Sequence, residues 1–182
     1  MLGKDENLNA IYPDLVTGGE SLAELINDGN CPLRRLNLSW NMIRLGGAND
    51  LCGSIQNSST LQHLDLSYNA LGQEASSILG SALLENKVLT HLILSNNGID
   101  EIGAFTLAVG MRENKVLQVV NLDGNPIGEQ GGLMLMRVAI FCGARLKFSA
   151  QSCDLKVTSP LTIMRVQGNK HHSYSTHILI LY

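Results

Sequence analysis

Histidine recurs at a fixed interval in this sequence, with an aspartate close by, in a combination that could hold a metal ion. His63 and His91 are separated by a 28-residue interval, and Asp65 follows shortly after His63. Imidazole and carboxylate groups are ordinary zinc ligands. The repeat pattern places no further strong metal ligand beside these residues. We therefore interpret these residues as part of a polar surface, and we predict neither a metal site nor a cofactor.

Two large aromatic residues share the same interval. It separates Trp40 from Tyr68, in a chain whose aromatic content is only 4%. Aromatic and arginine side chains are enriched in the energetic centres of protein interfaces. Together with Arg35, these residues are the first candidates for binding a partner. The alternative is that both rings pack over a turn and have a structural role.

Composition and motifs argue against several classes of function. The formal net charge of -3 gives no basic surface for nucleic acid, and no apolar run is long enough for a membrane helix. Phosphate-loop, dinucleotide, zinc-protease and nucleophile-elbow motifs are absent, so we predict that the protein is not an enzyme. The start of the sequence lacks the apolar stretch of a secretory signal, and no two of the four cysteines have the spacing of a zinc or redox motif. We therefore expect a reducing, cytoplasmic location.

The shared interval is the period of an internal repeat that covers most of the chain. Four copies begin with a leucine and read LRRLNLSWNMI, LQHLDLSYNAL, LTHLILSNNGI and LQVVNLDGNPI; their first residues are Leu33, Leu61, Leu89 and Leu117. Agreement at most positions in four copies is a specific signal of a repeat architecture.

Each copy has two halves with different periods. In the first half of the second copy, Leu64 and Leu66 alternate with His63, Asp65 and Ser67, which is the period of a strand. In the second half, apolar residues recur at spacings of three, four and seven, as on one face of a helix. A single strand and helix cannot bury their own apolar faces, so neighbouring copies must stack.

Stacking of the copies predicts an α/β solenoid with a parallel sheet on its inner face and helices on its outer face. Helices need about 10 Å of width and strands about 4.8 Å, so the stack curves into a segment of a horseshoe with the strands on the concave side. The strand alternation then places a set of side chains on the open concave surface. The candidate partner-binding residues on this surface are Trp40, Tyr68, Arg35, Asn37, His63, Asp65, His91, Asn96, Asn121 and Asp123.

Asparagine occupies one position in every copy, at Asn41, Asn69, Asn97 and Asn125. An asparagine there can satisfy backbone groups where the chain leaves the strand. We predict a buried structural ladder rather than a binding site. Two further asparagines, Asn86 and Asn114, suit a left-handed exit at the ends of helices.

The string L-x-x-L-x-L-x-x-N-x-[LI], with its 28-residue period and a full helix, resembles the leucine-rich repeats of the ribonuclease-inhibitor type. That resemblance covers residues 33–144 well. It implies a protein-binding solenoid, since the type includes ribonuclease inhibitor, activators of the Ran GTPase, repeat regions of NOD-like receptors and subunits of ciliary complexes.

The ends of the chain depart from the pattern, and this suggests three segments. Residues 1–32 form an irregular first repeat or cap, residues 33–144 form four regular repeats, and residues 145–182 form a degenerate repeat and tail. Pro13 replaces the asparagine in the first segment, and the asparagine is missing from the last.

These observations predict a non-enzymatic scaffold that binds a protein partner on its concave face. One alternative is a structural subunit of a large assembly, such as a ciliary or cytoskeletal complex. Another is a GTPase-activating regulator with polar residues such as Arg44 and Asn96 at one edge. We expect no nucleic-acid or membrane partner.

Overall fold

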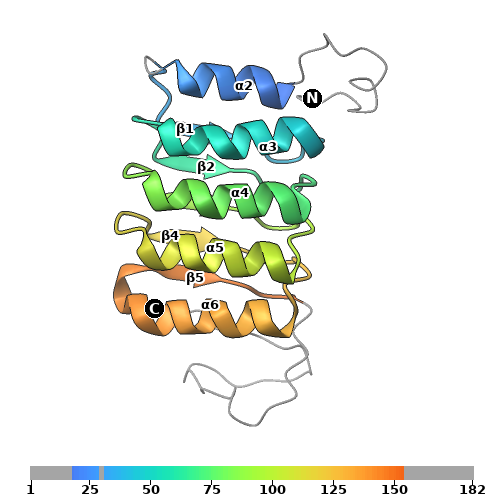
Figure 1. Ribbon diagram of the computed structural model, residues 1–182, viewed down its shortest axis with the longest axis vertical. Helices are drawn as coiled ribbons and strands as arrows, with labels where there is room; N and C mark the ends of the chain where they lie inside the picture. The colour runs from blue at the N-terminus through green and yellow to red at the C-terminus, as the bar shows by residue number, and fades with distance from the viewer. Residues whose placement is uncertain (1–17, 29–30, 154–182) are drawn as a thin grey trace.

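The computed structural model of the protein describes residues 18–28 and 31–153. Short strands alternate with helices along the chain (Figure 1). The strands are β1 (Arg35–Asn37), β2 (His63–Asp65), β3 (His91–Ile93), β4 (Val119–Asn121) and β5 (Lys147–Ser149). The helices are α2 (Gly18–Asn27), α3 (Leu45–Ser54), α4 (Gly72–Glu85), α5 (Glu101–Glu113) and α6 (Gly128–Cys142). The 3-10 turns η1 (Ile55–Asn57) and η2 (Gly143–Arg145) follow α3 and α6.

The strands form one parallel sheet in the order of the chain, β1-β2-β3-β4-β5. Pairing keeps the register of the sequence repeat throughout, so that Leu36 lies beside Leu64 and Leu64 beside Leu92. Val120 and Phe148 continue the same row in β4 and β5. The predicted fold is therefore confirmed: consecutive strand–helix units stack in register.

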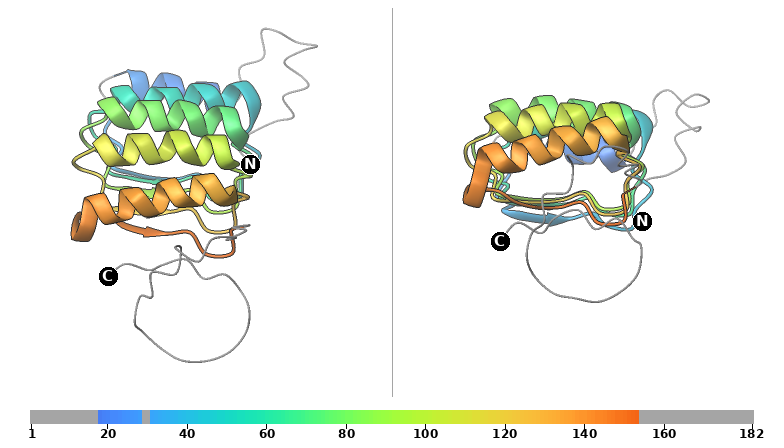
Figure 2. Two further views of the ribbon diagram at one scale, coloured as in Figure 1. Left: turned by 60° about the horizontal axis from the view of Figure 1, so that its bottom comes forward. Right: turned by 90° about the horizontal axis from the view of Figure 1, so that it is seen from below.

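The core lies between the two layers. Seen from below the stack, the helices lie on one side and the strands on the other (Figure 2). Leu64 and Leu66 of the second copy and Leu79 and Leu83 of α4 are 0–1% exposed between the layers. Each repeat contributes equivalent leucines, so a single apolar core runs the length of the described stack.

A ladder of asparagine side chains joins neighbouring repeats below the strands. The Nδ2 groups of Asn69, Asn97 and Asn125 each donate, at 2.9 Å, to the carbonyl oxygen 31 residues earlier, that is, to Leu38, Leu66 and Leu94. The Oδ1 atom of Asn125 accepts hydrogen bonds from the backbone N–H groups of Asn97 and Ile99. The amides thus satisfy backbone groups that have no partner in the sheet.

A second ladder, which we did not predict, stands at the other end of the helices. Asn86 and Asn114 are not left-handed, contrary to the prediction, because their φ angles are -67° and -66° in extended backbone. Their Nδ2 groups instead donate to the carbonyl oxygens 31 residues earlier, Ile55 and Leu83, at 2.7 and 2.8 Å. Both side chains are buried, so they tie each helix end to the preceding repeat.

The segment boundaries at residues 32 and 144 stay predictions. Strand β5 shows that the repeat register extends to Ser149. Residues 1–17 and 154–182, which include most of the predicted irregular ends, lie outside the described residues.

Candidate interaction surface

Trp40 and Tyr68 form an exposed aromatic pair where the first two strands turn toward their helices. Their ring centroids are 3.8 Å apart and their planes differ by 8°, so the rings are stacked. The Trp40 side chain is 70% exposed and Tyr68 is 42% exposed. With this exposure, the rings present a flat apolar surface to solvent, and the alternative that both are packed over a turn is not favoured.

The backbone under this aromatic pair is left-handed. Trp40 has a φ of 60° and Tyr68 a φ of 55°. The equivalent residues in the next copies, Asn96 and Gly124, have φ angles of 54° and 69°. Asn and Gly tolerate this conformation, whereas a bulky residue there costs roughly 1–2 kcal/mol. The Trp40 ring is too exposed for burial to offset that cost, and its stack on Tyr68 at most balances it, so folding gives no net reason for a tryptophan there.

Two aliphatic side chains extend the apolar character of this edge. Met42, in the loop between β1 and α3, and Leu45, the first residue of α3, are 51% and 58% exposed. These two residues were not predicted, because the repeat pattern is defined by its buried residues. The signal that could have found them is the contrast with Ala70 and Gln73, which stand at these positions in the second copy.

His63 and His91 lie side by side at the start of β2 and β3. Their rings are stacked, with centroids 4.1 Å apart. The Nδ1 atom of His91 lies 2.9 Å from the Thr90 hydroxyl oxygen. Burial, then the neighbouring His63 and the Arg35 guanidinium, lower the pKa of His91 from its ordinary value. The lowered pKa favours the neutral form of the His91 imidazole at neutral pH.

The structure does not bring Asp65 to the histidine pair. One oxygen of its carboxylate accepts hydrogen bonds from the backbone N–H and the hydroxyl of Ser67, at 2.9 and 2.6 Å. In the part of the chain that the structure describes, no cluster of three His, Cys, Asp or Glu residues could hold a metal ion.

The remaining candidates form a row of hydrogen-bonded polar groups across the open face. Asn37 binds Ser39 in the way that Asp65 binds Ser67. The Oδ1 atom of Asn121 accepts from the Ser95 hydroxyl at 2.7 Å. Asp123 accepts from the Ser149 hydroxyl and the Gln151 backbone N–H at 2.6 Å each. The bonds of Asn37 and Asp65 stay within one repeat, whereas those of Asn121 and Asp123 connect neighbouring repeats. Much of the hydrogen-bonding capacity of these groups is therefore used within the sheet.

Two candidates remain accessible beside this row. Arg35 is exposed at the start of β1, and Asn96 is exposed at the left-handed position after β3. The missing side chain of Gly124 makes room for the Asn96 amide, whose oxygen would clash with a Cβ there. The open face thus changes from aromatic in the first two copies to polar in the next two.

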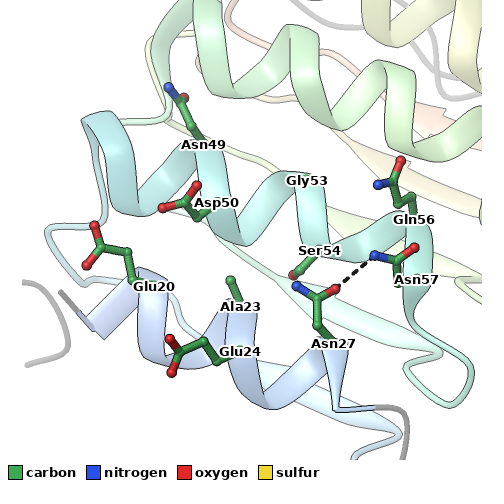
Figure 3. A pocket seen from close by; sticks show the side chains of 10 residues that line it. All are labelled: Glu20, Ala23, Glu24, Asn27, Asn49, Asp50, Gly53, Ser54, Gln56 and Asn57. Carbon is green, nitrogen blue, oxygen red and sulfur yellow. Dashed lines mark hydrogen bonds between the residues drawn. The ribbon is translucent and has the colours of Figure 1, made fainter. Parts of the chain in front are cut away.

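A separate groove of about 450 Å³ lies between α2 and α3 (Figure 3). Its walls carry the carboxylates of Glu20, Glu24 and Asp50, and the Asn27 and Asn57 side chains are hydrogen-bonded at its end. Burial, and then the charge of Glu20, raise the pKa of Asp50. None of the predicted site residues lies in this groove.

Two of the cysteines are too deeply buried to act as nucleophiles. All four are free thiols. Burial raises the pKa of the Cys52 thiol to about 12, and it also raises that of Cys153. Because the thiolate is the nucleophilic form, these buried groups are unreactive at neutral pH.

A family model described as "Leucine Rich repeat" matches the chain at residues 29–52, 57–75, 85–108 and 113–136. The four matches together cover half of the sequence. The chain belongs to the leucine-rich-repeat family. No curated protein sequence matches it.

The leucine-rich-repeat fold also appears in a similar solved structure, named "Leiomodin-1 Actin-Binding Site 2 (ABS2)". The likeness has a TM-score of 0.60 and covers 70% of this chain and 75% of that chain, at 15% sequence identity. Within residues 18–28 and 31–153, no helix combines the length and the apolar character needed to cross a bilayer.

Proposed function

We propose that this leucine-rich-repeat protein is a non-enzymatic scaffold that binds a protein partner on the open face of its sheet. The observation that carries the proposal is the aromatic pair of Trp40 and Tyr68. The two rings are stacked, exposed and held in a backbone conformation that suits Asn or Gly better. Exposed aromatic rings that folding does not require are typical centres of protein interfaces.

The rest of the face supports this assignment. The hydrogen bonds of Asn121 with Ser95 and of Asp123 with Ser149 hold neighbouring strands in fixed register. A rigid face loses little conformational entropy on binding, which increases affinity. Arg35 places a positive charge at the start of β1, beside the histidine pair, so the partner we propose carries a carboxylate on one side of an apolar contact.

The 28-residue period with a full helix in each repeat places the chain, in this proposal, in the ribonuclease-inhibitor type of leucine-rich repeat. We propose a cytoplasmic location on the same grounds. Membership of a larger complex, cytoskeletal or ciliary, is the alternative that the exposed apolar side chains of α5 and α6 favour.

Affinity capture with the full chain tests the binding face. The parent protein, Trp40→Asn and a control, Leu25→Asn, are each immobilised and incubated with extract of the native source. Asn is chosen because it stands at the equivalent left-handed position, at Asn96. Leu25 is also an exposed apolar residue, 43% accessible, but it belongs to the helix layer.

We expect the parent and Leu25→Asn to retain the same partner, and Trp40→Asn to lose it. Circular dichroism must show that all three proteins are folded. A Trp40→Asn protein that binds the identified partner with the parent's affinity would remove the aromatic pair from the site and the proposal with it. A loss of about 2 kcal/mol in binding free energy is typical of a central interface residue.

A further inference from the structure

The outer face of α5 carries a stripe of exposed apolar side chains that the repeat does not require. Ile102, Phe105 and Val109 are 56%, 48% and 37% exposed, at helical spacings of three and four. The equivalent residues of α4 are Glu74, Ser77 and Ser81, and those of α3 are Gly46, Asn49 and Gly53. Polar or small residues therefore suffice for stacking at these positions.

Helix α6 adds two more exposed apolar residues, level with the C-terminal end of α5. Ile140 and Phe141 are 63% and 60% exposed. The Arg112 guanidinium lies 5.0 Å from the centre of the Phe141 ring, which connects the C-terminal ends of α5 and α6. We call Ile102, Phe105, Val109, Ile140 and Phe141 the convex patch. Both helices belong to the layer that lies opposite the strands (Figures 1 and 2).

Charge is distributed unequally between the two ends of the helices that carry this patch. Residues 70–76, 98–104 and 126–132, at the N-terminal ends of α4 to α6, contain Glu74, Asp100, Glu101 and Glu129 and neither Lys nor Arg. At the C-terminal ends, Lys87, Arg112, Lys115 and Arg145 outnumber Glu85 and Glu113. The patch therefore lies between an acidic end and a basic end.

We propose that a second copy of this chain covers the convex patch, with the two α5 helices antiparallel across a two-fold axis. A two-fold interface uses the same surface on both copies. The antiparallel arrangement lays the acidic end of each copy on the basic end of the other, whereas a parallel one would oppose like charges. A two-fold axis near Phe105 brings Phe105 of one copy against Phe105 of the other, and Ile102 of one copy toward Val109 of the other.

The self-association is separate from the binding face proposed above. The strand face lies on the other side of the core, so both copies of the dimer leave Trp40 and Tyr68 uncovered. The two proposals can therefore fail independently, since one is read from partner binding and the other from the mass of the purified chain.

Sedimentation velocity of the purified full chain, from low to high micromolar concentration, tests this inference. We expect the mass to rise from one chain to two. Phe105→Glu places a charge at the centre of the contact and should raise the dimer dissociation constant by at least about tenfold. The matched control is Leu25→Glu, which makes the same kind of change on α2 and should leave the dimer intact.

A charge-reversal cycle tests the antiparallel orientation. Glu101→Lys and Arg112→Glu should each weaken the dimer, and the double variant should recover much of the parent's affinity, because each residue would again face an opposite charge. Circular dichroism and the thermal midpoint show whether each variant is folded.

Three results would overturn the proposal. A chain that sediments as a monomer at every concentration would mean that another protein, or solvent, covers the patch. A dimer that Phe105→Glu leaves intact would place the contact elsewhere. Single charge reversals without effect would exclude the antiparallel arrangement.

Discussion

At the left-handed position after each strand, the side chain changes along the stack from Trp40 and Tyr68 to Asn96, Gly124 and Ser152. The later residues show what the backbone needs at this point, which is a small or locally polar side chain. The earlier ones keep a similar φ with rings that are 70% and 42% exposed. At the scale of the residue, the requirements of folding and of binding can thus be separated at one position.

We expect Trp40→Asn to change the free energy of unfolding by less than about 1 kcal/mol. Relief of the left-handed strain, roughly 1–2 kcal/mol, opposes the loss of the ring stack, roughly 0.5–1.5 kcal/mol. Urea unfolding monitored by circular dichroism measures the difference. A destabilisation of about 3 kcal/mol would show that the ring supports the fold, and its exposure would then no longer indicate a binding role.

His91 makes stability depend on pH in a defined direction. Its pKa in the folded protein lies below the ordinary value of 6.5, first because of burial and then because of His63 and Arg35. As the pH falls through 6.5, the unfolded chain takes up a proton before the folded chain does. Stability present at neutral pH should therefore decline as the pH falls from 6.5 through the folded pKa of His91.

Urea midpoints measured between about pH 7.5 and pH 5.5 check this dependence. His91→Gln keeps a polar side chain and removes the titration, so its midpoint should vary less over the same range. A variant whose midpoint follows the parent's at every pH would assign the dependence to other groups.

Between elements, glycine decides how closely helices approach. A Cβ at Gly110 of α5 would collide with the carbonyl oxygen of Gly80 in α4, and the Gly80 backbone cannot move without shifting its helix. A Cβ at Gly53 of α3 would come no closer than 3.6 Å to Ile78. Both glycines lie within helices, but only Gly110 has the backbone of a neighbouring helix where its Cβ would be.

Gly110→Ala should therefore destabilise the protein by about 1–3 kcal/mol, as overpacking does. Gly53→Ala should instead stabilise it by up to about 1 kcal/mol, because alanine favours helix and meets no obstacle. Chemical denaturation of both variants measures the contrast. Equal effects of the two substitutions would show that α4 and α5 do not pack as closely as described.

The repeat made the elements predictable, and the departures from prediction have local causes. Strand register followed from Leu64 and Leu92 standing at equivalent positions of consecutive copies, because stacked copies must match. Asn86 was assigned a left-handed backbone because helices often end with one. Its buried hydrogen bond to the carbonyl of Ile55 depends on the preceding repeat, which the helix end alone does not reveal.

The sequence predicted the positions of the site residues better than it predicted the contacts of their side chains. The alternation put Asp65 on the open face, where it lies in β2, but its carboxylate is engaged by Ser67 just beyond the strand. The spacing of apolar residues in the helices predicts the face that packs on the sheet, and it makes no prediction for the outer face that carries the convex patch. Phe105 and Ile102 do not change the spacing of the buried residues of α5, so that spacing does not reveal them.

Across the whole molecule, stability should be graded along the stack. Leu92, Leu94 and Leu107 in the middle are fully buried, while Ala23 and Ile26 in α2 and Phe148 in β5 keep 4–5% exposure. In a repeat protein each unit is stabilised by the neighbours that bury its side chains, and burial is less complete in α2 and β5 than in the middle units.

Hydrogen exchange of the full chain should therefore show the slowest amides in β3 and its neighbours and faster exchange in α2. Mass spectrometry of peptides from each repeat measures the gradient. Uniform protection from α2 to β5 would mean that the stack opens only as one cooperative unit.

The even spacing of the strands also limits the shape of what can lie across them. Neighbouring repeats present equivalent side chains about 4.8 Å apart, close to the roughly 5.4 Å rise of one helical turn. An extended chain advances about 3.4 Å per residue and falls out of step after one repeat. A helix laid across the strands would mesh with the sheet one turn per repeat, so that successive turns meet Trp40, Tyr68 and Asn96 in order.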